Sequence, residues 1–250
     1  MNRSVRATLI VVLLSALLGC ANIYEANLFA DFDGPPSASE LANASIDEIA
    51  EAAESPQFFD ELANDPEAKE TIQNRLQEIY NDTNASDEDR RSAAILSGDV
   101  EMETTAGGEV VNNVVDVLLS GDGDFSDPAT LVESIFPESI RNDPTALREQ
   151  LESFQTASEA YQVYGDDLDS EGVPEGANSG EIAQRATVAI LINTLAVEAG
   201  GVDALASDIE NDNLGGYSDP TEDALGTESA PTSLRNILDV AGLTGVVEGG

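Results

Sequence analysis

The sequence has no histidine and no tryptophan, and it has one lysine and one cysteine. Without histidine the chain cannot form a Ser-His-Asp triad, use an imidazole base or build a histidine metal site. Lys69 carries the one side-chain amine, and no Ser-x-x-Lys pattern surrounds it. Cys20 carries the one thiol, so no disulfide can form within the chain. These absences exclude most nucleophilic, thiol and zinc enzymes.

Aromatic residues make up only 5% of the chain, whereas sugar-binding clefts usually present several aromatic rings for stacking. The 49 acidic residues would supply a pair of carboxylates at a suitable spacing by chance alone, so a carboxylate-pair glycosidase is not excluded. We therefore expect a protein that is not an enzyme. A carboxylate-based hydrolase of the cell envelope is the least favoured alternative.

A long apolar run lies near the amino terminus. Arg3 and Arg6 precede LIVVLLSALLG at 9–19, which is 11 residues long. A membrane-spanning helix needs about 20 apolar residues, so this shorter run is typical of the apolar part of a signal peptide. We expect residues 1–19 to be a signal peptide.

Leu17-Leu18-Gly19-Cys20 resembles the lipobox of bacterial lipoproteins, although Leu18 is larger than the residue usual at that place. The resemblance implies a diacylglycerol on the Cys20 sulfur, cleavage before Cys20 and acylation of the new amino group. The alternative is an ordinary secretory signal with a cysteine near its cleavage site. Ala21 and Asn22 follow, and the lack of Asp there favours the outer membrane by resemblance to bacterial sorting rules. Residues 20–36, which end in DGPP, are expected to form a lipidated tether.

Charge is strongly one-sided, with 49 acidic residues against 10 basic ones and a formal net charge of −39. Residues 1–19 contain two arginines and no acid, so the remaining chain carries −41. Such a composition resembles that of proteins from salty habitats, where a Debye length of about 3 Å at about 1 M salt screens self-repulsion. The alternative is an exported protein that is acidic without being halophilic. Nucleic acid is excluded as a partner, because its phosphates would meet a negative surface.

The remaining chain predicts helices. Ser37 with Glu40 and Ser45 with Glu48 fit capping boxes, and Asp65-Pro66 fits a cap followed by a proline at the first helical position. Apolar residues recur every three or four positions over 68–80, 110–119 and 147–164, which indicates one buried helical face. TVAILINTLAV at 187–197 is apolar on almost all sides and predicts a central buried helix. We expect an all-α protein of about eight to ten helices.

Several short motifs occur twice in the same order. NDP occurs at 64–66 and 142–144, RSAAIL at 91–96 resembles RATVAIL at 185–191, AGG recurs at 106–108 and 199–201, and FSDP at 125–128 resembles YSDP at 217–220. We interpret them as an internal duplication, with coincidence among common helix-boundary residues as the alternative. The prediction is a helical bundle or short α-solenoid-like stack of two similar units. The first spans 37–126 with an N-terminal cap, and the second spans 127–250 with a C-terminal cap.

One acidic stretch has the spacing of a calcium loop. Asp122, Asp124, Ser126 and Glu133 fall at positions 1, 3, 5 and 12 of an EF-hand loop. Asp127 stands where the loop needs glycine, and the alternative is a solvated turn in which Asp127 caps a helix that begins at Pro128. DLDSEG at 167–172 is a second, poorer match, with Asn178 where a glutamate belongs.

Tyr161 and Tyr164 lie at helical spacing and could line a binding groove, but packing in the core is the favoured interpretation. The apolar stripe of 233–243 is expected to close the helical stack, with docking of a partner helix as the alternative. The functional expectation is a binding or scaffold lipoprotein, anchored to the membrane at Cys20 on the periplasmic face of the outer membrane, for a protein or envelope component. A calcium-responsive structural lipoprotein is the alternative, and no other cofactor is expected.

Overall fold

The computed structural model describes residues 41–120, 127–168, 172–174, 177–226 and 229–243, and these residues form helices and connecting turns without a strand. The predicted all-α class is confirmed. The helices number 12 in these ranges, more than the eight to ten expected, because short helices such as α9 were not foreseen. They are α3 (Ile46–Ala53), α4 (Pro56–Asn64), α5 (Pro66–Asn81), α6 (Asp87–Glu103), α7 (Gly107–Ser120), α8 (Pro128–Ile135), α9 (Glu138–Arg141), α10 (Pro144–Asp166), α11 (Ser179–Ala199), α12 (Val202–Glu210), α13 (Pro220–Leu225) and α14 (Thr232–Val240).

Side-chain caps fix several helix starts where the sequence predicted them. The Ser45 backbone N–H donates to Glu48 Oε2 at 2.8 Å while the Ser45 hydroxyl accepts from the Glu48 N–H, which completes the capping box of α3. Asp65 and Asp143, the aspartates of the two NDP motifs, cap α5 and α10, and each is followed by a proline at the first helical position. The Ser37–Glu40 box lies outside the described residues.

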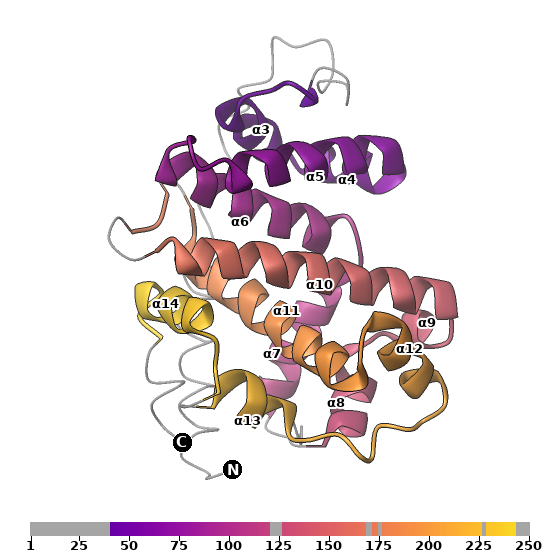
Figure 1. Ribbon diagram of the computed structural model, residues 1–250. Helices are drawn as coiled ribbons and strands as arrows, with labels where there is room; N and C mark the ends of the chain where they lie inside the picture. Colours follow the sequence, from indigo (N-terminus) through magenta and orange to yellow (C-terminus); the bar gives the residue numbers. More distant parts are fainter. Residues whose placement is uncertain (1–40, 121–126, 169–171, 175–176, 227–228, 244–250) are drawn as a thin grey trace.

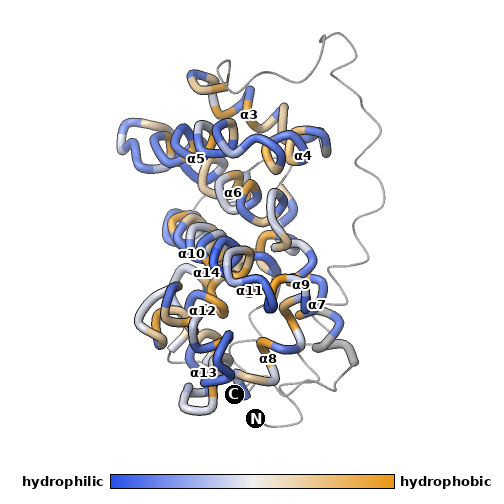
Figure 2. Tube along the Cα trace, turned by 90° about the vertical axis from the view of Figure 1, so that its right-hand side faces the viewer, coloured by the Kyte–Doolittle hydropathy of each residue, from blue (hydrophilic) through white to orange (hydrophobic). Residues whose placement is uncertain are grey.

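The long helices lie in successive layers, with α5 above α6, α6 above α10, and α10 against α11 (Figure 1). The longest of them, α10, also packs against α12 and α14, so it stands at the centre of the molecule. Its inner face buries Leu147, Leu151, Phe154, Tyr161 and Tyr164. Hydrophilic and apolar residues alternate along most helices in Figure 2, as expected when one face of each helix enters a core.

Helix α11 is the buried helix that the sequence predicted. Ten of its residues are buried, Ile182 and Leu195 among them, and it packs against α10, α12, α13 and α14. It is long and apolar enough to cross a membrane by length and composition, yet 56% of its most apolar stretch is buried inside the protein. Its apolar composition is therefore accounted for by its place in the core.

Two glycines allow helices to approach closely. A Cβ on Gly98 of α6 would lie 2.5 Å from Cζ of Tyr161 on α10, so the aromatic ring fills the place of the missing side chain. A Cβ on Gly165 of α10 would lie 2.3 Å from the Ser233 carbonyl oxygen in α14, and Asn236 Nδ2 donates to the Gly165 carbonyl at 2.9 Å. Helix α14 thus packs closely against the central helix α10, as expected if the stripe at 233–243 faces the other helices.

The repeated motifs fall at matching places in the order of helices. Each NDP opens the first helix of a series, α5 or α10, the AAIL-type segments lie in α6 and α11, and the SDP prolines open α8 and α13. The AGG motifs differ: Gly200 and Gly201 adopt positive φ between α11 and α12, whereas α7 begins at Gly107 itself. One core runs continuously from Leu41 to Leu238 across both proposed units. The similarity of the two units remains a prediction.

Candidate functional site

All eight basic residues that follow the proposed signal peptide lie in the described ranges, and each makes a polar contact within the protein. Four of them join separate segments of the fold through carboxylates. They are Lys69, Arg90, Arg148 and Arg185. The scarce cations therefore stabilise the packing of helices, and carboxylates dominate the charge that remains at the surface.

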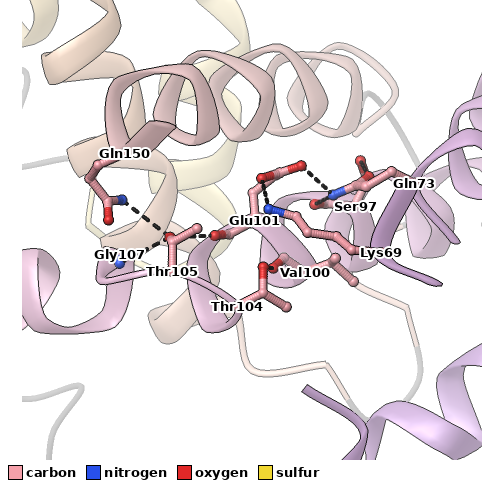
Figure 3. A network of polar contacts seen from close by, with 9 residues as sticks. All are labelled: Lys69, Gln73, Ser97, Val100, Glu101, Thr104, Thr105, Gly107 and Gln150. Atoms are coloured by element: carbon pink, nitrogen blue, oxygen red, sulfur yellow. Dashed lines mark hydrogen bonds and ion pairs between the residues drawn. The ribbon is translucent and has the colours of Figure 1, made fainter. Parts of the chain in front are cut away.

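The single lysine belongs to a network of polar contacts between α5 and α6 (Figure 3). Lys69 Nζ on α5 lies 2.6 Å from Oε2 of Glu101 on α6. Glu101 is only 7% exposed. Gln73 Nε2 donates to the other Glu101 carboxylate oxygen at 2.9 Å, and the Ser97 hydroxyl donates to Gln73 Oε1 at 2.7 Å. A buried carboxylate needs both a countercharge and hydrogen bonds, and this network supplies them. The lysine is thus held in a structural role.

A second network joins α6, α10 and α11. Arg185 of α11 donates to Asp99 Oδ1 at 2.7 Å and also binds Glu103, while the Tyr161 hydroxyl donates to Asp99 Oδ1 at 2.9 Å. Burial raises the pKa of the Tyr161 phenol well above its ordinary value, and the negative charge of Asp99 adds to this effect. Burial by itself would lower the pKa of Arg185, but Asp99 and Glu103 outweigh it and raise that pKa. Both groups therefore keep their protons at any physiological pH.

The end of α10 is bound to the start of α6. Arg90 lies 2.8 Å from Oδ2 of Asp167, and Arg91 donates to the Asp167 carbonyl oxygen at 3.3 Å. Asn178 caps α11 by accepting from the N–H groups of Gly180 and Glu181. Two residues of the second proposed calcium stretch, Asp167 and Asn178, thus have structural partners.

An open groove of about 610 Å³ lies where the start of α3 meets the end of α5 and the start of α6. Its apolar lining comes from Ile46, Ile79 and Ala85. Ile46 and Ile79 are themselves mostly buried, at 7% and 9% exposure, so they form a floor rather than a projecting patch.

The remaining lining of the groove is mainly anionic. Its one cation, Arg75, donates to the Ala44 carbonyl oxygen at 3.0 Å and lies 3.4 Å from Glu78 Oε2. Hydrogen bonds from the backbone and side chain of Asn84 lower the pKa of Asp82. The charged lining carboxylates are Asp47, Glu78, Asp82 and Asp89. The groove therefore combines four carboxyl groups with one engaged guanidinium.

The first calcium stretch is described only in part. Asp122, Asp124 and Ser126 lie outside the described residues, and Glu133 is exposed on α8. Asp127 caps α8 by accepting from the Thr130 N–H at 3.1 Å, as the alternative interpretation predicted. Within the described ranges no three acidic residues converge in a way that could hold a metal ion. The calcium loop remains a prediction.

The tyrosines are core residues, as favoured: Tyr161 and Tyr164 are 0% and 1% exposed. Cys20 and the proposed signal peptide lie outside the described residues.

The sequence alone predicted neither the groove nor the Lys69–Glu101 pair. One feature of the sequence does indicate that Glu101 is buried. It lies at helical spacing from Ala94 and Ser97, on a face of α6 formed by small residues.

No protein-family model matches this chain, and comparisons with curated proteins and with solved structures found no match.

Proposed function

We propose that this protein is an exported lipoprotein, held at a membrane by lipid on Cys20, whose helical body binds or scaffolds a protein or another envelope component. The observation that carries the proposal is the distribution of reactive side chains. The one lysine and all the arginines after the proposed signal peptide have contacts within the fold, while an open groove presents carboxylates and an apolar floor. Such an arrangement is suited to contact with a partner rather than to nucleophilic chemistry.

The length of the proposed tether supports this role. Residues 20–36, the proposed tether, number 17. A chain of that length reaches at most about 60 Å, at about 3.6 Å per residue. An anionic body can then stand away from anionic lipid headgroups and face the surrounding compartment.

Hydrolysis has less support. A carboxylic acid that acts as a general acid near neutral pH needs a raised pKa. Hydrogen bonds instead lower the pKa of Glu48, Asp82 and Asp208: Ser45 donates to the first, Asn84 to the second, and Tyr217 with Asn213 to the third. Nothing in the described ranges favours a hydrolytic or calcium-responsive role over binding, and these two remain alternatives.

Metabolic labelling of the full chain tests the anchor. A bacterial host fed an alkyne analogue of palmitate should produce a labelled chain that sediments with membranes. Cys20→Ser should abolish both properties because it removes the only sulfur that could carry the lipid. Asn22→Ala, two residues away, is the matched control and should remain labelled. An unlabelled wild-type chain, or label that persists in Cys20→Ser, would contradict the lipoprotein proposal.

A further inference from the structure

We infer that the groove between α3, α5 and α6 is a docking site for a basic peptide segment of a partner protein, with an aliphatic side chain inserted between its lysines or arginines. This inference rests on the proposed binding function and names the chemistry of the partner. It depends on three features of the groove: its volume, its apolar floor and its charge.

Volume and floor together set what can enter. The groove of about 610 Å³ lies within the range of about 300–1,000 Å³ that ligand sites occupy, so it accommodates a few side chains rather than a whole domain. Ile46 and Ile79 offer apolar atoms at its base, where an aliphatic side chain or the methylene stem of a lysine gains contact area.

The acidic lining of the groove favours a partner segment with positive charge. Asp47 on α3 and Glu78 on α5 are both exposed and line the groove, and Asp82 and Asp89 complete its acidic lining. Arg75 is already engaged by the Ala44 carbonyl and Glu78, so it does not neutralise the other three carboxylates. Four of the other cations are paired with carboxylates elsewhere in the fold, so they do not offset the charge of the groove. A cationic segment is therefore both steered to the groove and complementary to it.

A basic peptide suits the groove better than a metal ion does. No three acidic groups of the described residues converge closely enough to coordinate a cation. The lining instead combines four carboxylates from three helices and a turn with apolar atoms of Ile46 and Ile79. A peptide that alternates basic and aliphatic residues can contact both kinds of group.

Fluorescence anisotropy of the full chain in nonionic detergent tests the inference. The probe is a fluorescein-labelled peptide of alternating lysine and leucine, and the comparison peptide replaces leucine by serine at equal charge. The serine peptide should bind at least threefold more weakly, because it cannot use the apolar floor. Wild-type affinity should fall as salt is raised, at concentrations where circular dichroism shows the chain folded.

Two double variants of equal charge locate the binding. Asp47→Asn/Glu78→Gln removes two carboxylates of the groove, and the Kd should rise about three- to tenfold, the effect of losing two exposed charge pairs. Glu149→Gln/Glu152→Gln removes two exposed carboxylates of α10, which does not line the groove, and the Kd should change by less than about 1.5-fold. Ala85→Arg places a positive charge in the groove and should also raise the Kd, as Asp47→Asn/Glu78→Gln does.

The outcomes separate this inference from the proposed function. Equal weakening by both double variants, or equal binding of the two peptides, would show general attraction to an acidic protein and would overturn the docking site. That result would leave fatty-acid labelling at Cys20 untouched. Loss of labelling with peptide binding intact would overturn the anchor and leave the groove.

Discussion

Glu101 illustrates how single residues constrain a chain with so few cations. Its carboxylate is nearly buried, and Lys69 supplies its countercharge from the neighbouring helix. Lys69→Met should lower the free energy of unfolding by about 3 kcal/mol, because removing one partner of a buried pair leaves an uncompensated charge. Lys69→Met/Glu101→Gln should recover most of this loss, since glutamine needs no countercharge. Chemical unfolding at fixed high salt measures both.

The exposed pair between Arg148 and Asp203 provides the control for that prediction. Its side chains are 45% and 86% exposed, so Arg148→Met should cost less than about 1 kcal/mol. Equal losses for Lys69→Met and Arg148→Met would show that the Lys69–Glu101 pair has no special importance.

The buried tyrosine hydroxyls should make the stability of the fold fall as pH rises into the alkaline range. Burial raises the pKa of Tyr80, Tyr161, Tyr164 and Tyr217 above the ordinary value of 10.0, and that of Tyr164 to about 12. A folded pKa above the unfolded one means that the folded state holds the proton more tightly. Stability from Tyr164 is therefore complete below about pH 10 and is lost as pH rises to about 12. Tyr164→Phe should flatten this part of the curve of melting temperature against pH, and an unchanged slope would contradict the assignment.

At the scale of helices, the contact between α6 and α10 depends on one glycine. Gly98→Ala should gain up to about 1 kcal/mol from helix propensity alone, but its Cβ would meet the Tyr161 ring at 2.5 Å. We expect a net loss of about 1–3 kcal/mol from this overpacking. Gly108→Ala in α7 is the matched control, because no atom lies within 4 Å of its added Cβ, and it should be neutral or stabilising. Thermal unfolding of both variants decides the matter, and a stabilised Gly98→Ala would contradict the packing.

Helix starts and core faces could be predicted from the sequence, whereas helix pairing could not. Ser45, Asp65 and Asp143 act through hydrogen bonds to neighbours two or three residues away, so local spacing reveals them. Gly98 and Tyr161 are 63 positions apart, and nothing local indicates that one accommodates the other. The groove was missed for the same reason, because three separate helices and their connecting turns build it. The calcium loop and the lipobox were proposed from spacing alone and remain predictions.

Calcium binding by the turn before α8 can be tested directly. If Asp122 and Glu133 are ligands, calorimetry with calcium at millimolar concentration should give smaller heats for Asp122→Ala/Glu133→Ala than for the unmodified chain. Asp127→Asn keeps the helix cap and serves as the control. Equal heats from the unmodified chain and the double variant would show that Asp122 and Glu133 bind no calcium and that the turn only caps α8.

For the whole molecule, the imbalance between 49 acidic and 10 basic residues decides the sign of the salt response. Salt weakens attraction and repulsion alike, but attractive pairs are limited by the few cations, whereas repulsion acts among all the carboxylates. Melting temperature should therefore climb steeply between about 0.1 M and about 2 M NaCl, where the Debye length falls from about 10 Å to below about 3 Å. Sucrose separates this effect from general exclusion, because it stabilises compact states without screening charge. A flat response to NaCl would mean that the carboxylates are too far apart to strain the fold, and it would remove the reason to place this protein in a salty habitat.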